Sequence, residues 1–103
     1  MKYFLIKYRF ATGSKDEWHA EIARFIAALE SDPELAGRIS YRCMKAKEGA
    51  DYYHIASPVD DAAAKALGER AYFEHYTAAS DRVSNGTVEV IPLEVVAETT
   101  YKA

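Results

Sequence analysis

The chain has 103 residues and a net charge of −3, and half of its residues are hydrophobic. This length and composition predict one globular domain over residues 1–103. The acidic balance argues against a nucleic-acid partner, because there is no basic excess to neutralise phosphates. No apolar run approaches the roughly 18 residues of a membrane span. A single cysteine, Cys43, cannot form an internal disulfide, so we expect a cytoplasmic protein.

The first third of the chain predicts a strand followed by a helix. Residues 2–10 alternate between an apolar face and a mixed face, as a strand does. Ser14 followed by Glu17 is a capping-box pattern, so a helix is expected to begin there and to end near Ser31. The buried stripe of this helix is expected to contain Trp18, Ile22, Phe25, Ile26 and Leu29.

Two strands are expected next, over residues 38–46 and 51–57, joined by a turn at residues 47–50. Tyr41 and Arg42 must point to opposite faces of the first of these strands, so only one of them can face a pocket. Both faces of the strand are mixed in character. The alternation therefore leaves both orientations open.

A second helical region is expected to start at Asp60 or Asp61. Gly68 is a weak point in it, because glycine costs about 1 kcal/mol relative to alanine inside a helix. The region is expected to continue from Ala71 to about Val83, where it carries several aromatic residues. A tight turn should follow at Asn85-Gly86.

The last predicted strand covers residues 87–99 and is interrupted at Pro92, which cannot donate to a sheet ladder. The resulting order, β-α-β-β-α-β, predicts a ferredoxin-like α+β domain with an antiparallel sheet and two helical regions on one face. Because the strands have two mixed faces, we expect a second copy to cover the other face in a homodimer. The alternative is a monomer with a partly solvated sheet face.

Four segments carry a resemblance to a known family. They are YRFATGS at the end of the first strand, ISYR in the second, AYFEHYTAAS in the second helical region and TVEVIPLEVV in the last strand. In this order they resemble the dimeric α+β barrel proteins of the antibiotic-biosynthesis-monooxygenase-like group, over nearly the whole chain. That group includes cofactor-independent oxygenases of aromatic polyketides or quinols, haem-degrading enzymes and proteins of unknown role.

The haem-degrading branch of the group fits this chain poorly. Its members are similar to one another in having an Asn on the first strand, and a Trp and a His from the second helical region. Here Lys7 lies near the Asn position, and the only Asn is Asn85 in a turn. Trp18, the only Trp, lies on the first helix. Haem degradation is therefore disfavoured, and we expect no bound cofactor.

His54 is the first candidate for catalysis, because it lies mid-strand between aromatic residues and its ordinary pKa suits a general base or acid. The alternative is a structural histidine.

Arg42 or Lys7, if it faced a pocket, would stabilise a developing anion. The alternative for both is an interface or rim charge. If Tyr41 faced the pocket instead of Arg42, it would donate a hydrogen bond or stack on a substrate.

Tyr72, His75 and Tyr76 are candidates for substrate binding, because their spacing places Tyr72 on one helix face with each of the other two. The alternative is that Tyr76 is core and His75 is solvated. His19 lies next to Trp18 but off the buried stripe, so we expect it to be solvated. The three histidines lack metal-ligand spacing, and no metal site is expected. Cys43 is expected to be an inert thiol.

The leading functional hypothesis is a cofactor-independent, monooxygenase-like enzyme that acts on a small phenolic or quinol-type molecule. In it His54 is the base, Tyr72 and Tyr76 position the substrate, and Arg42 or Lys7 stabilises the anion. One alternative is a non-catalytic dimer, either a binder of a small aromatic ligand or a stress-associated protein. Another is an isomerase or lyase that uses the same histidine without oxygen.

Overall fold

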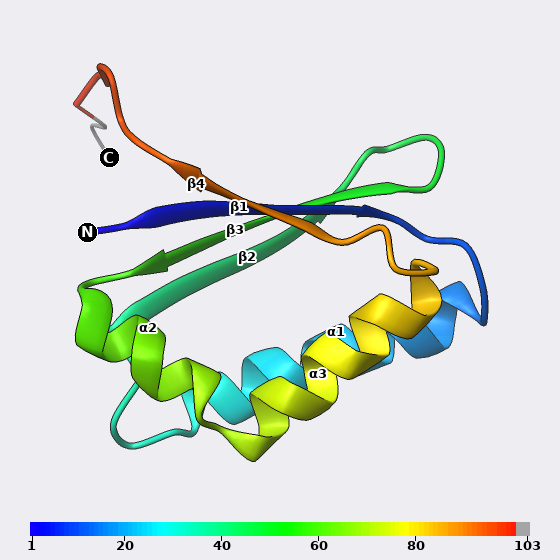
Figure 1. Cartoon of the computed structure of the whole chain (residues 1–103), viewed down its shortest axis with the longest axis horizontal. Coiled ribbons are helices and arrows are strands. Elements are labelled where there is room, and N and C mark those ends of the chain that lie inside the picture. The colour runs from blue at the N-terminus through cyan, green and yellow to red at the C-terminus, as the bar shows by residue number, and fades with distance from the viewer. Residues whose placement is uncertain (101–103) are drawn as a thin grey trace.

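The computed structural model describes residues 1–100 and confirms the predicted ferredoxin-like α+β fold (Figure 1). The last three residues of the predicted domain, 101–103, lie outside the described residues. The elements in chain order are β1 (Tyr3–Arg9), α1 (Lys15–Glu30), β2 (Ile39–Lys45), β3 (Asp51–Pro58), α2 (Asp61–Gly68), α3 (Ala71–Val83) and β4 (Glu89–Leu93).

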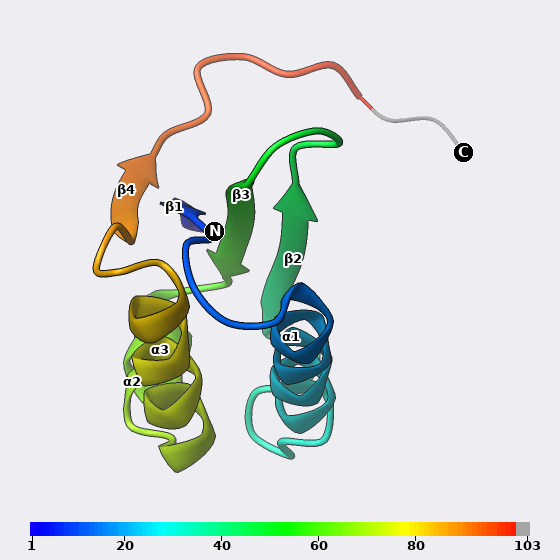
Figure 2. The ribbon, with the colours of Figure 1, turned by 90° about the vertical axis from the view of Figure 1, so that its right-hand side faces the viewer.

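The four strands form one antiparallel sheet in the order β2-β3-β1-β4. All three helices lie on the same side of this sheet, and none of residues 1–100 forms a helix on the other side (Figure 2). The register places Tyr8 opposite Tyr52, and Cys43 opposite His54. The side chains of one sheet face therefore converge under the helices, which form a second layer.

Local capping explains where the helices begin. The Ser14 side chain accepts a hydrogen bond from the Glu17 backbone N–H, at 3.3 Å. Asp60 accepts one from the Ala63 N–H at 2.8 Å and caps α2. The second helical region is divided in two at Gly68, as its low helix propensity predicts, and α3 continues from Ala71.

The last strand is shorter than the sequence predicts. We expected residues 87–99, but β4 ends at Leu93. Among the strands of residues 1–100 it pairs only with β1, and Leu93 lies opposite Tyr3, the first residue of β1. Beyond that point no strand is available as a partner, and the chain leaves the sheet on the side away from the helices (Figures 1 and 2). Pro92 is tolerated because β4 is an edge strand.

The core lies between the sheet and the helix layer, and it includes Leu67 of α2 and Tyr76 of α3. Trp18, Phe25 and Leu29 are buried, which confirms the predicted stripe of α1, and they pack in one cluster with Tyr8 and Tyr52 of the sheet. Ile22 and Ile26 pack against this cluster and are partly buried.

The opposite face of the sheet is apolar at its centre. Ile55, Leu5 and Ile91 lie side by side across β3, β1 and β4, and each is half-buried. Arg42 continues this row on β2, opposite Ile55.

None of the helices within residues 1–100 is both long enough and apolar enough to span a membrane.

Candidate functional site

His54 on β3 is the centre of a buried polar network, with only 1% of its surface exposed. Its Nε2 lies 3.0 Å from Oη of Tyr8, and its Nδ1 lies 3.2 Å from Oη of Tyr76. Trp18 Nε1–H donates to the Tyr8 hydroxyl at 2.9 Å. These four residues, from β1, α1, β3 and α3, are hereafter the His54 network.

The protonation of this network follows from its donors. The Tyr8 oxygen accepts from Trp18, and its own proton has no acceptor among residues 1–100 other than Nε2 of His54. Nε2 therefore carries no proton, and Nδ1 of the neutral ring donates to Tyr76. Burial favours the neutral ring and lowers the pKa of His54 to about 4.

Aromatic rings enclose the Tyr76 end of the network. Tyr76 stacks on Phe25 with ring centroids 4.1 Å apart, and on Trp18 at 5.7 Å. The Tyr41 ring packs edge-on against Tyr76 at 6.4 Å and against His54 at 6.3 Å. Burial raises the pKa of both Tyr41 and Tyr76 well above that of an ordinary phenol. Both hydroxyl groups therefore stay protonated at neutral pH.

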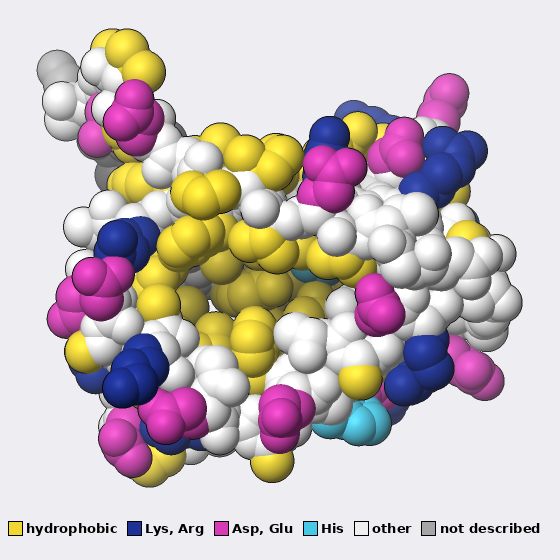
Figure 3. Space-filling model, viewed as in Figure 1, with side chains coloured by type: hydrophobic (Ala, Val, Ile, Leu, Met, Phe, Trp, Pro, Cys, Tyr) yellow, Lys and Arg dark blue, Asp and Glu magenta, His cyan; other side chains and the backbone are white. Residues whose placement is uncertain are grey.

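An apolar cavity of about 220 Å³ lies between the sheet and helices α2 and α3. Figure 3 shows a hollow lined with hydrophobic side chains between the sheet and these helices. The lining, which defines the α2/α3 cavity, comprises Phe4, Ile6, Ile39, Tyr41, Ala56, Pro58, Ala64, Leu67, Phe73 and Val90. Tyr41 alone among them has a hydrogen-bonding side chain, and it also contacts the His54 network. The cavity and the network therefore share one wall.

Tyr41 and Arg42, whose orientation the sequence left open, are now placed. Tyr41 lies on the helix-facing side of β2 and lines the cavity. Arg42 is exposed on the other face, opposite Ile55. Lys7 also lies on that face, on β1, with its ammonium 3.8 Å from the Glu89 carboxylate. Arg42 and Lys7 therefore lie on the opposite side of the sheet from His54.

Tyr72 belongs to a different cluster, at the start of α3. Its hydroxyl donates to Asp32 at 2.7 Å, and Arg70 Nε donates to the same carboxylate at 2.8 Å. Arg70 and then Tyr72 hold the pKa of Asp32 well below its ordinary value. Burial, and after it the hydrogen bond to Asp32, raise the pKa of Tyr72 to about 12. Because Tyr72 bonds to Asp32 and does not line the cavity, this cluster ties α3 to the loop after α1.

The remaining histidines lie on or near the surface. His75 is exposed on α3, with Nε2 2.6 Å from the Glu21 carboxylate of α1. His19 is exposed as expected, but its Nε2 also lies 2.7 Å from Oη of buried Tyr52. Among the predicted site residues, the fold therefore brings together His54, Tyr76 and Tyr41. It does not bring Tyr72, His75, Arg42 or Lys7 to them.

Sequence reasoning missed two members of the network, Tyr8 and Trp18. Both were assigned to apolar faces, and nothing in their spacing indicates that their polar atoms meet at His54. The cavity residues of α2, Ala64 and Leu67, were also missed as site residues. Within residues 1–100, no group of three or more His, Cys, Asp and Glu side chains is arranged to hold a metal ion.

No protein-family model and no curated protein sequence matches the chain. Solved structures do match it closely in fold. SnoaB, a cofactor-independent oxygenase from Streptomyces nogalater, superposes with a TM-score of 0.70 at 18% identity, over 96% of this chain and 95% of that one. An antibiotic biosynthesis monooxygenase superposes with a TM-score of 0.77 at 11% identity, over 94% of this chain and 100% of that one.

A third match is a dimeric ferredoxin-like protein of unknown function from Jannaschia sp. CCS1. Its TM-score is 0.65 at 18% identity, over 92% of this chain and 100% of that chain. These likenesses confirm that the chain has the fold predicted from the resemblance. At such low identity they establish the fold alone.

Proposed function

We propose that this protein is a small oxygenase-like enzyme that acts, without a bound cofactor, on a neutral phenolic or quinol-type molecule in the α2/α3 cavity. The observation that carries the proposal is the position of Tyr41, which lines the cavity and packs against both His54 and Tyr76. The fold shared with SnoaB, a cofactor-independent oxygenase, supports the reaction class.

In the proposed reaction the substrate itself supplies the electrons. Loss of a proton from an activated C–H or O–H group gives an anion, which transfers one electron to O₂. The two radicals combine into a peroxide at carbon, which takes up a proton. Loss of water then leaves a carbonyl group. A CH₂ group and O₂ thus become C=O and H₂O, which balances atoms and electrons.

The lining of the cavity restricts which molecule can react. No lining residue is charged, so a neutral ligand is favoured over an acid or a phosphate. The cavity also lacks a basic group. The substrate must therefore carry a hydrogen acidic enough to be lost to water or hydroxide, and turnover should rise with pH as the substrate ionises.

Tyr41 is the residue proposed to touch the substrate. Its neutral hydroxyl donates to the oxygen on which negative charge develops, the role of an oxyanion-stabilising donor. His54 and Tyr76 are positioning residues in this scheme, because they pack behind the Tyr41 ring and His54 is too buried to reach the cavity. This differs from the sequence-based hypothesis that His54 is itself the base, which remains untested.

A homodimer is part of the same proposal. The row of Leu5, Ile55 and Ile91 is half-buried and lies on the face without helices. A second copy packed on this face would bury it. The related fold from Jannaschia is described as dimeric, which supports this arrangement.

The test is oxygen uptake with a panel of one- and two-ring phenols and quinols, with anaerobic and heat-denatured controls. We expect Tyr41→Phe to lower uptake by about a hundredfold, the usual effect of removing one such donor. Tyr72→Phe, which removes a hydroxyl that bonds to Asp32 outside the cavity, is the matched control and should leave uptake by the folded protein unchanged. Equal rates for Tyr41→Phe and the native protein would show that the assigned role is wrong.

A second candidate function is non-catalytic binding of a neutral aromatic ligand. The specific observation in its favour is that no basic side chain lines the α2/α3 cavity. A binder should be stabilised thermally in proportion to ligand concentration, without converting the ligand. Stabilisation without oxygen uptake across the panel would therefore replace the oxygenase proposal with this one.

A further inference from the structure

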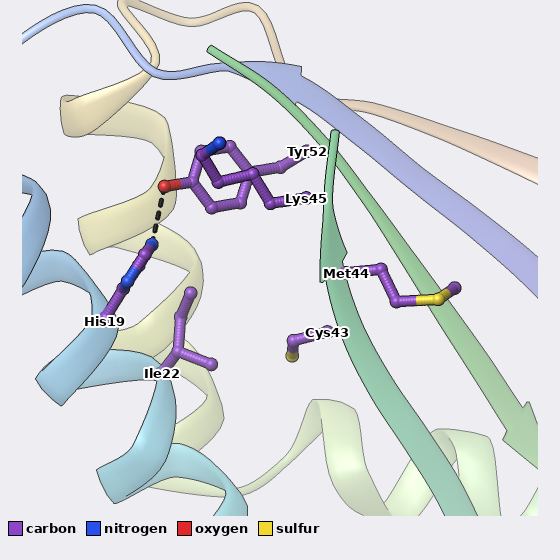
Figure 4. A pocket seen from close by; sticks show the side chains of 6 residues that line it. All are labelled: His19, Ile22, Cys43, Met44, Lys45 and Tyr52. Atoms are coloured by element: carbon purple, nitrogen blue, oxygen red, sulfur yellow. Dashed lines mark hydrogen bonds between the residues drawn. The ribbon is translucent and has the colours of Figure 1, made fainter. Parts of the chain in front are cut away.

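A second pocket lies on the other side of the core, between helix α1 and edge strand β2. It encloses about 180 Å³. Its lining, which defines the α1/β2 pocket, comprises His19, Ile22, Cys43, Met44, Lys45 and Tyr52. Figure 4 shows the hydrogen-bonded His19 and Tyr52 at one end with the Lys45 side chain, and Ile22 and Cys43 towards the other. The pocket therefore has a polar end and an apolar end.

Lys45 is distinguished from the other half-buried cations of the described chain. Lys7, Arg38 and Arg70 each pair with a carboxylate within 4 Å. Lys45 is half-buried too, but no carboxylate of residues 1–100 lies within that distance. Its ammonium donates only to the carbonyl oxygen of Ala46, at 2.7 Å. Two of its three donors therefore have no protein partner there.

Two further hydrogen-bonding groups lie at the same end. Tyr52 is buried, yet its hydroxyl reaches His19 Nε2 at 2.7 Å at the edge of the pocket. The hydrogen bond between His19 and Tyr52 uses one donor and one acceptor of the pair. The other ring nitrogen of His19 and a lone pair of the Tyr52 hydroxyl can still bond to a ligand. With Lys45 they form a cationic, hydrogen-bonding end on a protein of net charge −3.

The opposite end carries no charge. Ile22 is an aliphatic wall, and burial raises the pKa of the Cys43 thiol to about 11, so the sulfur stays protonated and neutral. The pocket thus contains no negative group that would repel an anion. Its size suits one ring, since a cavity of about 150 Å³ holds benzene.

We propose that the α1/β2 pocket binds a small aromatic or aliphatic carboxylate of about the size of benzoate. The carboxylate lies against Lys45 and His19, and the apolar body lies against Ile22 and Cys43. One carboxylate matches one ammonium group, and the apolar wall disfavours a more strongly hydrated phosphate. This site is independent of the oxygenase proposal, because it lies outside the α2/α3 cavity and needs no turnover.

The test is a two-dimensional ¹H–¹⁵N NMR titration with sodium benzoate at constant ionic strength, with benzamide as the neutral analogue. We expect saturable shifts centred on Ile22 and Cys43. The native protein should bind benzamide at least about tenfold more weakly than benzoate, the cost of one charge-assisted hydrogen bond. The Lys45→Met variant should bind benzoate more weakly than the native protein does, by a similar factor. Lys47→Met removes the same charge from an exposed position two residues away, and it should bind benzoate as the native protein does.

Three results would overturn the proposal. The first is equal binding of benzoate and benzamide, which would show that the anion is not recognised. The second is benzoate binding by Lys45→Met that matches Lys47→Met. The third is the absence of saturable shifts, or their location on the residues of the α2/α3 cavity.

Ile22→Trp, which fills the pocket without changing its charge, should abolish benzoate binding. The melting temperature of this variant verifies that it is folded.

Discussion

The hydroxyl of Tyr8 lies 3.0 Å from Nε2 of His54, and it is the only group among residues 1–100 that hydrogen-bonds to both His54 and Trp18. All three side chains are buried, with exposed fractions of 4%, 1% and 2%. One oxygen atom therefore satisfies two buried nitrogens on different elements. These two hydrogen bonds link β1, α1 and β3 at the centre of the core.

Tyr8→Phe should consequently destabilise the fold by more than a single hydrogen bond is worth. The variant keeps the ring but leaves the Trp18 N–H and His54 Nε2 without partners. Each unsatisfied buried group costs about 1–3 kcal/mol. Denaturant unfolding should thus show a loss of about 2 kcal/mol or more. Thr77→Val, which removes a hydroxyl from an exposed position of α3, should unfold within about 0.5 kcal/mol of the native protein.

The His54 pKa predicts a pH dependence of stability. The unfolded side chain titrates at 6.5 and the folded one at about 4. Between these values the unfolded state binds a proton that the folded state does not, so stability falls as pH falls through this window. The loss from His54 should total about 3 kcal/mol at pH 4.

The comparison of native protein with His54→Gln isolates this contribution, because His19 and His75 are present in both. The variant will be less stable at pH 7, but its stability should change less between pH 6.5 and 4. Parallel curves for the two proteins would mean that His54 binds as many protons in the folded state as in the unfolded state. That result would contradict the assignment of a neutral His54 ring in the fold.

Asp32 predicts a second, lower pH window. Its folded pKa is held below the unfolded 3.8, chiefly by Arg70 and then Tyr72. Its stabilisation is therefore present above about pH 4 and is lost as pH falls below that. Asp32→Asn should melt at a lower temperature than the native protein at pH 7, and the gap should narrow below pH 4. Glu34→Gln is the control, since Glu34 contacts Arg70 from an exposed position and should have little effect.

The elements that the sequence predicted well are those set by local chemistry. Ser14 and Asp60 cap their helices through bonds three residues away, and Gly68 divides the second helical region where its propensity is poor. The predicted end of β4 was wrong because the length of a strand depends on where its partner strand begins. Residues 87–99 give no indication that the partner, β1, begins at Tyr3.

The His54 network was beyond sequence reasoning for a related reason. Tyr8 and His54 are 46 residues apart, and their contact depends on the register between β1 and β3. The alternation of side chains divides a strand into two faces, but it does not indicate which face lies under the helices. Arg42 and Lys7 were therefore as eligible as Tyr41 until the helices were placed.

The uncovered sheet face gives the last prediction, a dimer that a single charge should break. Ile55 lies at the β3 end of the apolar row, between Leu5 on one side and Arg42 on the other. In a face-to-face dimer Ile55→Glu would remove a carboxylate from water, and a pairing with Arg42 opposite it would recover only part of that cost of several kcal/mol. Analytical ultracentrifugation should show a dimer for the native protein. For Ile55→Glu, the dissociation constant of the dimer should rise by roughly a hundredfold or more. Ala23→Glu adds the same charge to the exposed face of α1 and should remain dimeric. A native protein that stays monomeric at high micromolar concentration would instead show that this face is solvated in the working molecule.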